Sequence, residues 1–235
     1  MKKVFLTLTM LLFAFVGTMR ADEVTIGDPT ATTVNSYLPT YSLYEKSFTQ
    51  QIYTADEIGM AGTINTLTMW LKNSSSYARN LNVYMKEVEE TSFASATAWV
   101  SMSSSDLVGS FSLANGISSP VETAVELTTP FEYTGAGNLV ICIQDVTGSW
   151  SGGAGSVVNT TTEYQAIYAY RDGTTYDPSN PGVNGTIVKV KSVVMLDITP
   201  AGPAGALTTT PDVFSAALNS GELTFVLGSA NLCDR

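Results

Sequence analysis

Residues 138–146 read Asn-Leu-Val-Ile-Cys-Ile-Gln-Asp-Val, with five consecutive apolar residues at 139–143. A short apolar run of this kind, bounded by turn-forming residues, is typical of a β-strand that is buried on both faces. Gly-rich segments at 134–137 and 148–155 flank it and indicate turns. We therefore expect residues 138–146 to form the central strand of a sheet, with Cys142 packed as a small hydrophobic residue.

Further from this run, apolar and polar residues alternate, as they do in half-buried strands. In one example, Leu67, Met69 and Leu71 share a face, and Thr and Trp side chains occupy the other. Strands are expected at 24–26, 48–53, 63–72, 79–86, 107–113, 121–127, 164–170 and 186–198. Helical periodicity is almost absent, with one helical turn expected within 89–98. The pattern predicts an all-β fold, an antiparallel and jelly-roll-like β-sandwich over residues 22–199.

Beyond this sandwich the composition changes. Residues 200–206 read Pro-Ala-Gly-Pro-Ala-Gly-Ala, which is typical of a linker. Residues 207–235 contain two weak strand patterns, but 29 residues are too few to bury a core of their own. We expect a short, incomplete second β-module there, or a hairpin docked on the first domain. Cys233 falls in this region, and we expect it to be a free thiol or to bond to a group that this sequence does not contain.

The first 21 residues have the three parts of a secretory signal peptide: a basic start at Lys2 and Lys3, an apolar run at 4–16, and small residues before a cleavage site after Ala21. The apolar run is shorter than the roughly 20 residues of a membrane-spanning helix. The sequence therefore predicts a protein that is secreted or on the outer surface, with no membrane span after cleavage.

The composition excludes several functions. The 235 residues contain no histidine, so nucleophiles that need an imidazole base, and most catalytic zinc sites, are excluded. Eleven Lys and Arg against 21 Asp and Glu give a net charge of −10, which argues against a nucleic-acid partner. Paired carboxylates can hydrolyse glycosides without histidine, so a glycoside hydrolase remains a remote alternative.

Several short sequence segments follow one another in a distinctive order along the chain. They are Tyr-Ser-Leu-Tyr-Glu-Lys-Ser-Phe (41–48), Gly-Thr-Ile (62–64), Arg-Asn-Leu-Asn-Val-Tyr-Met (79–85), Thr-Pro-Phe-Glu-Tyr-Thr-Gly (129–135) and Asp-Pro-Ser-Asn-Pro (177–181). Together they resemble a repeated β-sandwich module of secreted and surface multidomain proteins of the Bacteroidota, found beside cleaved-adhesin, fibronectin type III and immunoglobulin-like modules. The resemblance covers residues 26–199. It implies a non-catalytic, jelly-roll-like module for adhesion or ligand binding, and it supplies no catalytic residues.

Two groups of residues are candidate sites. Asp172 and Asp177 lie in one loop with Gly and Asn, and their oxygens suit a structural calcium ion. The alternative is ordinary turn chemistry, because Asp-Gly and Asp-Pro form tight turns without an ion. Trp150, in a Gly/Ser loop, and Tyr168 and Tyr170, which share a strand face, are candidates for stacking against a sugar ring. Their alternative is ordinary strand packing.

These observations predict a non-catalytic interaction or adhesion module of a larger bacterial protein. Its expected partners are a host or matrix protein or a glycan, together with other modules of the same polypeptide. The alternative is a carbohydrate-binding module.

Overall fold

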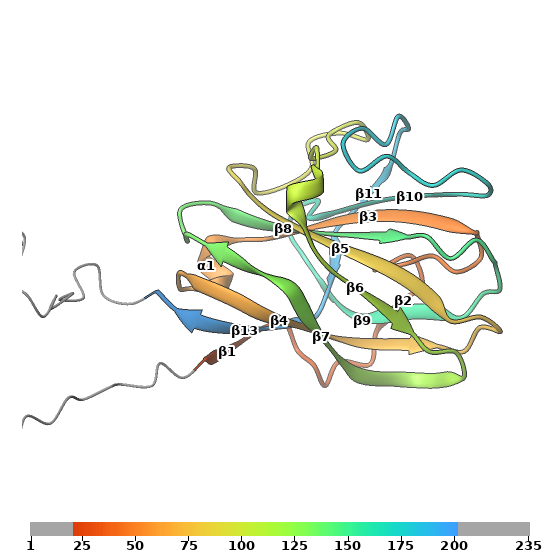
Figure 1. Ribbon diagram of the computed structural model, residues 1–235, viewed down its shortest axis with the longest axis horizontal. Helices are drawn as coiled ribbons and strands as arrows, with labels where there is room; N and C mark the ends of the chain where they lie inside the picture. The colour runs from red at the N-terminus through yellow and green to blue at the C-terminus, as the bar shows by residue number, and fades with distance from the viewer. Residues whose placement is uncertain (1–20, 202–235) are drawn as a thin grey trace, which may run out of the picture.

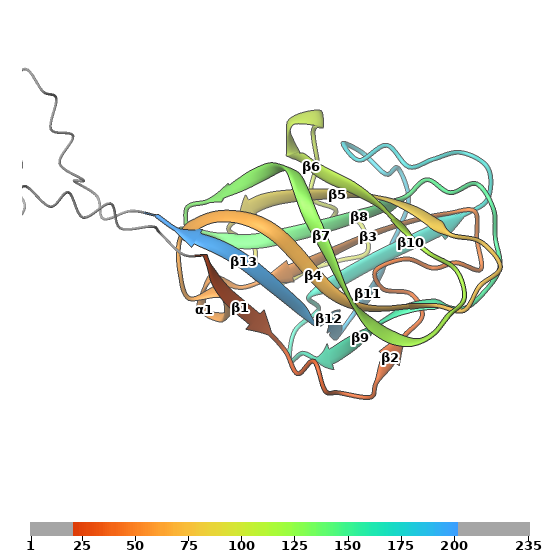
Figure 2. The ribbon, with the colours of Figure 1, turned by 60° about the horizontal axis from the view of Figure 1, so that its bottom comes forward.

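The structure is a computed structural model that describes residues 21–201. It consists of two antiparallel sheets packed face to face, with one short helix, α1 (Ala55–Ile58), and a 3₁₀ turn, η1 (Ser104–Asp106). Figure 1 shows the two sheets as stacked layers, and Figure 2 brings the lower one forward. The predicted all-β antiparallel sandwich is confirmed.

The first sheet has seven strands, five of them in the order β1-β13-β4-β9-β12, with β7 paired to β4 and β2 to β9. They are β1 (Asp22–Ile26), β2 (Val34–Asn35), β4 (Gly62–Asn73), β7 (Ile117–Tyr133), β9 (Ala154–Thr160), β12 (Val190–Ser192) and β13 (Val194–Pro200). The second sheet has six strands in the order β11-β10-β3-β8-β5-β6. They are β3 (Lys46–Tyr53), β5 (Arg79–Val88), β6 (Leu107–Leu113), β8 (Asn138–Asp145), β10 (Ala166–Arg171) and β11 (Thr186–Val188).

The apolar run at 138–146 is the central strand β8, which lies between β3 and β5. Ile141 and Ile143 point into the core between the two sheets. Val140 and Cys142 point the other way, into a second apolar cluster on the outer face of this sheet. The middle of the strand, residues 139–143, is apolar because both of its faces are buried.

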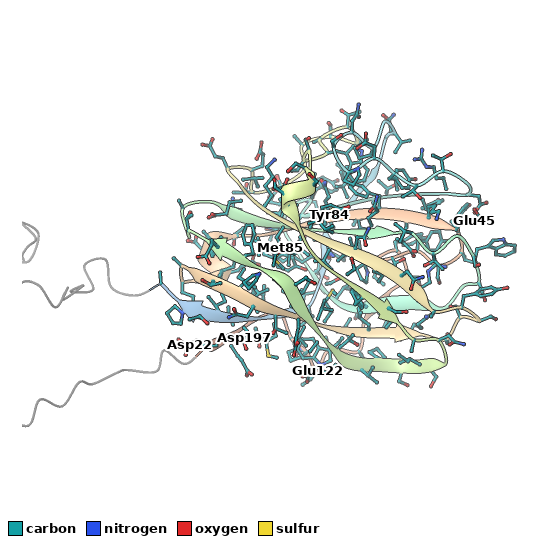
Figure 3. All side chains as sticks on the ribbon, viewed as in Figure 1. Asp22, Glu45, Tyr84, Met85, Glu122 and Asp197 are labelled. Carbon is teal, nitrogen blue, oxygen red and sulfur yellow. The ribbon has the colours of Figure 1, made fainter. Side chains whose placement is uncertain are left out.

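The outer face of the second sheet is buried by two irregular segments, residues 89–106 and 172–185, which we call the outer cover. Trp99 ties them together, since its indole Nε1 donates a 2.8 Å hydrogen bond to the carbonyl of Val183. Figure 3 labels two neighbours on β5 that contrast the two cores: Met85 belongs to the core between the sheets, and Tyr84 to the cluster under the outer cover. No helix forms within 89–98, where a helical turn was expected; these residues run as bends with one hydrogen-bonded turn, in which the N–H of Ala98 donates to the carbonyl of Ser95 at 3.1 Å.

The N-terminal strand and the last strand lie side by side. Asp22 on β1 is opposite Ile198 on β13, so the described chain enters and leaves at the same end of the sandwich (Figure 1). The predicted signal peptide lies outside the described residues except for Ala21. The predicted linker at 200–206 lies outside them except for Pro200 and Ala201, and the C-terminal module at 207–235 lies wholly outside them. All three stay predictions.

Candidate functional site

Five tyrosines pack together where the loop before β3 lies against strand β10 of the second sheet, on the face of β10 away from Ile167 and Ala169, and we call them the tyrosine cluster. Tyr168 and Tyr170 come from β10, and Tyr37, Tyr41 and Tyr44 come from residues 36–45, the loop between β2 and β3. Ring centroids are 4.3 Å apart for Tyr44 and Tyr170, 4.8 Å for Tyr41 and Tyr170, and 4.8 Å for Tyr37 and Tyr168. Contacts at these distances are typical of favourable aromatic pairs.

Polar side chains on β3 hold this loop against the sheet. The backbone N–H of Tyr41 donates to the hydroxyl of Ser47 at 3.1 Å, and the hydroxyl of Thr49 donates to the carbonyl of Pro39 at 2.8 Å. Ser47 and Thr49 are the residues opposite Tyr170 and Tyr168 in the β3–β10 ladder. The hydrogen bonds that hold the loop therefore come from the residues directly across from Tyr170 and Tyr168, and they keep the loop tyrosines against these two strand tyrosines.

A buried ion pair fixes the far end of the same loop. Arg79 Nε lies 2.7 Å from Asp145 Oδ2, and the hydroxyl of Thr40 donates to the same carboxylate oxygen. The other oxygen of Asp145 accepts from the N–H of Thr147 at 3.0 Å and from its hydroxyl at 2.6 Å. The buried carboxylate is thus hydrogen-bonded through both oxygens, which offsets the cost of removing it from water.

Arg79 also connects two surface loops to each other. Its Nη2 donates to the carbonyl of Tyr44 at 3.0 Å, and its Nη1 donates to the carbonyl of Ser149 at 2.5 Å. One side chain therefore positions both the loop that supplies Tyr44 and the loop that supplies Trp150. Rigid placement of this kind lowers the entropy that a binding surface loses when it engages a ligand.

Of the three aromatic residues singled out from the sequence, the structure brings two together. Tyr168 is buried and Tyr170 is 39% exposed, with 6.3 Å between their ring centroids. Trp150 is 59% exposed, and within the described chain no aromatic ring packs against it. The site therefore contains Tyr168 and Tyr170, and Trp150 stands apart from their ring contacts.

Sequence reasoning missed Tyr37, Tyr41 and Tyr44. The available signal was their density, three tyrosines within eight residues of a segment that has no strand pattern. Burial, together with the neighbouring tyrosines, raises the pKa of Tyr41 above its ordinary value of 10.0, and burial likewise raises the pKa of Tyr168. Both hydroxyls are neutral near pH 7, so the cluster offers aromatic faces and neutral hydroxyl groups.

Both candidate calcium ligands already accept hydrogen bonds, Asp177 within its own turn and Asp172 from the loop at Glu45. Asp177 Oδ1 accepts from the N–H of Ser179 at 2.9 Å and from its hydroxyl at 2.7 Å, and these bonds lower the pKa of Asp177. Asp172 Oδ1 accepts from the N–H of Glu45 at 3.1 Å. Within residues 21–201, no group of three or more His, Cys, Asp or Glu side chains is arranged to hold a metal. Calcium at Asp172 and Asp177 stays a prediction.

A separate polar pocket of about 430 Å³ lies beside α1, with Glu57 and Lys191 in its wall. The ammonium of Lys191 lies 2.6 Å from Glu57 Oε2 and 2.9 Å from Gln165 Oε1. Burial lowers the pKa of Lys191, although Glu57 partly opposes this shift. Because Glu57 also caps the helix by accepting from the N–H of Thr54 at 2.8 Å, we assign this pair a structural role.

No protein-family model matches the chain, and no curated protein matches it. In the described part of the chain, no helix is both long enough and apolar enough to cross a membrane. The geometry of the tyrosine cluster is therefore the feature of the described chain that points to a function.

Proposed function

We propose that this protein is a non-catalytic interaction module, secreted or displayed on the outer surface as part of a larger bacterial protein. The observation that carries the proposal is the tyrosine cluster, an aromatic surface held in place by the buried Arg79–Asp145 pair. Exposed tyrosines supply a large contact area with little loss of conformational entropy, which is why they are enriched in binding surfaces. The predicted signal peptide, and the first strand beginning directly after its cleavage site, support export.

Attachment of the full chain to host cells and to matrix proteins tests this proposal. Tyr41→Ala and Tyr44→Ala should weaken attachment together, because both side chains belong to one surface. Tyr77→Ala is the matched control, since Tyr77 is 48% exposed and lies outside the cluster. Attachment that is equal in all three variants would contradict the assignment of the cluster. Deletion of residues 22–199 from the bacterium, with no loss of attachment, would contradict the adhesive role.

A carbohydrate-binding module is the second candidate, and the exposed parts of the Tyr37 and Tyr170 rings favour it. Carbohydrate binding requires an aromatic surface for stacking and polar groups nearby. Unlike catalysis, it requires no group that transfers a proton. A glycoside hydrolase would need two carboxyl groups about 5–10 Å apart across a cleft. The polar pocket beside α1 has one carboxylate in its wall, Glu57, and Lys191 binds it.

A further inference from the structure

A second, smaller pocket of about 220 Å³ lies next to the tyrosine cluster, at the edge of β10. Tyr168 and Tyr170 contribute to its wall, and so do Asn184, just before β11, and Thr186, the first residue of β11. The pocket exists because β11 pairs with β10 only over 166–168, so that β10 continues past it to Arg171. Because Tyr168 and Tyr170 belong to both, the pocket and the cluster form one continuous surface.

We propose that this surface is a binding site for a neutral oligosaccharide, with one sugar unit in the pocket and the adjoining unit stacked on the tyrosine cluster. The proposal deepens the carbohydrate-binding candidate above and rests on it. The pocket is smaller than the roughly 300–1,000 Å³ of sites for drug-sized ligands, so it accommodates a single small ring.

The packing of the cluster favours a stacked ring over a caged cation. Aromatic cages bind quaternary ammonium groups in the space between separated rings. Here the rings fill that space themselves, as shown by the 4.6 Å between the centroids of Tyr37 and Tyr41 and the 4.3 Å between Tyr44 and Tyr170. The surface that remains for a ligand is largest at Tyr37, 36% exposed, and Tyr170, 39% exposed, with smaller contributions from Tyr41 and Tyr44. The C–H face of a pyranose ring suits such a platform.

The charges around the pocket favour a neutral ligand. Among the described residues that line the pocket, Arg171 is the one with a positive charge, and its guanidinium already contacts other groups of the protein. It donates to the carbonyls of Thr174 at 2.6 Å and Thr175 at 2.8 Å, and lies 4.0 Å from the centre of the Tyr176 ring. The next residue is the acidic Asp172, which bonds to the loop at Glu45. Asp172 lies outside the described wall of the pocket, which contains no carboxylate. A sulfate, phosphate or uronic acid would have to compete with the two carbonyls and the Tyr176 ring for the guanidinium of Arg171, whereas a neutral sugar needs no cation.

The hydrogen-bond pattern of β10 argues against an extended peptide as the ligand. The N–H of Ile52 donates to the carbonyl of Gln165 at 2.8 Å, and this bond sets the parity of the strand. Residues 165, 167, 169 and 171 direct their backbone groups toward β3, and the alternate residues direct theirs toward β11. Tyr168 is already opposite Thr186, so Tyr170 alone has backbone groups on the open edge. Strand addition needs a longer free edge than one residue.

The test is calorimetric titration of the full chain with soluble neutral polysaccharides, namely a β-glucan, a mannan and a galactan, and with sulfated and uronic-acid counterparts. We expect at least one neutral polysaccharide to bind, and its affinity to fall by about tenfold or more in Tyr170→Ala and Asn184→Ala. Tyr170→Phe keeps the ring and should retain most of the binding. Trp150→Ala and Tyr77→Ala should bind as the unchanged chain does. Thermal unfolding of each variant verifies that it is folded.

Three results would overturn the proposal. They are a preference for the sulfated or uronic-acid polysaccharides, neutral binding that Tyr170→Ala leaves unchanged, and no binding to any polysaccharide in the panel. In the last case, attachment to a matrix protein that depends on Tyr41 and Tyr44 would leave the interaction module standing and identify its ligand as protein. Binding of a proline-rich peptide at Tyr170 would likewise identify the ligand as protein and leave the interaction module standing.

Discussion

The guanidinium of Arg79 binds the carboxylate of Asp145 with 2.6 Å between Nη2 and Oδ2, and neither side chain has any solvent exposure. An ion pair buried this deeply is not by itself a source of stability, because both charges lose their hydration. Here the pair brings together strands β5 and β8 and the two loops that carry Tyr44 and Trp150. Its value lies in fixing the geometry of the candidate binding surface.

Removal of one partner should therefore cost far more than the loss of a surface ion pair. We expect Arg79→Leu to lower the free energy of unfolding by about 3–5 kcal/mol, because it leaves the Asp145 carboxylate buried without its cation. Chemical denaturation measures this. The control is Lys86→Ala, which breaks the exposed pair with Asp106 at 3.9 Å and should cost about 0–1 kcal/mol. Equal losses in the two variants would contradict the role given to the buried pair.

Stability should depend on Glu57 in acid. Burial raises the pKa of this carboxyl, but hydrogen bonds from Lys191 and Thr54 outweigh it, so the pKa lies below the ordinary 4.5. The unfolded chain then takes up the proton at a higher pH than the folded protein. The Glu57 contribution is therefore complete above the unfolded pKa and is lost as pH falls through the folded pKa.

Unfolding free energies measured from about pH 6 to about pH 3 should accordingly fall less steeply in Glu57→Gln than in the unchanged chain. Glu89→Gln, which changes an exposed acid, is the matched control. The same slope in Glu57→Gln and in the unchanged chain would show that the Lys191 contact does not stabilise the carboxylate.

The outer cover should be sensitive to volume at Gly185. A Cβ there would lie 2.5 Å from Trp99 Cζ2 and 2.6 Å from Ile167 Cγ1, both closer than real contacts allow. We expect Gly185→Ala to cost about 1–3 kcal/mol in denaturant unfolding, as overpacking does. At Gly109 on β6 the nearest atom would be 3.6 Å away, an ordinary contact. Gly109→Ala should be neutral or stabilising by up to about 1 kcal/mol, and a reversed order would show that the cover is loosely packed.

Calcium can be tested directly. An ion held by Asp172 and Asp177 in the folded state would raise the thermal midpoint, because binding to the native state alone adds stability. Since Asp177 already accepts hydrogen bonds within its own turn and Asp172 accepts one from Glu45, we expect the midpoint to be the same in calcium and in chelator. Asp177→Ala should lower it in both buffers. A midpoint that rises with calcium, and does so only when both aspartates are present, would establish the ion.

The strands could be predicted where the sequence either alternates between apolar and polar residues or is continuously apolar. Residues 107–113 alternate and form β6 with those bounds, and the continuous run at 138–146 became β8. β9 was missed because Ala154, Gly155 and Ser156 are small residues that follow a Gly/Ser turn, and they are buried despite carrying little apolar surface. The single strand expected at 186–198 is three strands, because the chain leaves the second sheet after Val188 and continues in the first.

Two of the five tyrosines in the candidate site were also predictable. The spacing of Tyr168 and Tyr170 places them on one face whatever the rest of the chain does. Tyr37, Tyr41 and Tyr44 join them from more than 120 residues away in sequence, through a loop whose path depends on Ser47, Thr49 and the Arg79–Asp145 pair. Local patterns do not encode such contacts, because they arise only when both sheets have assembled.

The position of the chain ends has a consequence for presentation. Asp22 lies at one end of the sandwich and Glu45, next to Tyr44 of the cluster, at the opposite end (Figure 3). Because β1 begins directly after the predicted cleavage site, further modules of the same polypeptide would follow β13, at the pole away from the cluster. The tyrosines would then face outward from the rest of the polypeptide. Several molecules displayed side by side would engage a repetitive target at several points, so that individually weak contacts combine into durable attachment.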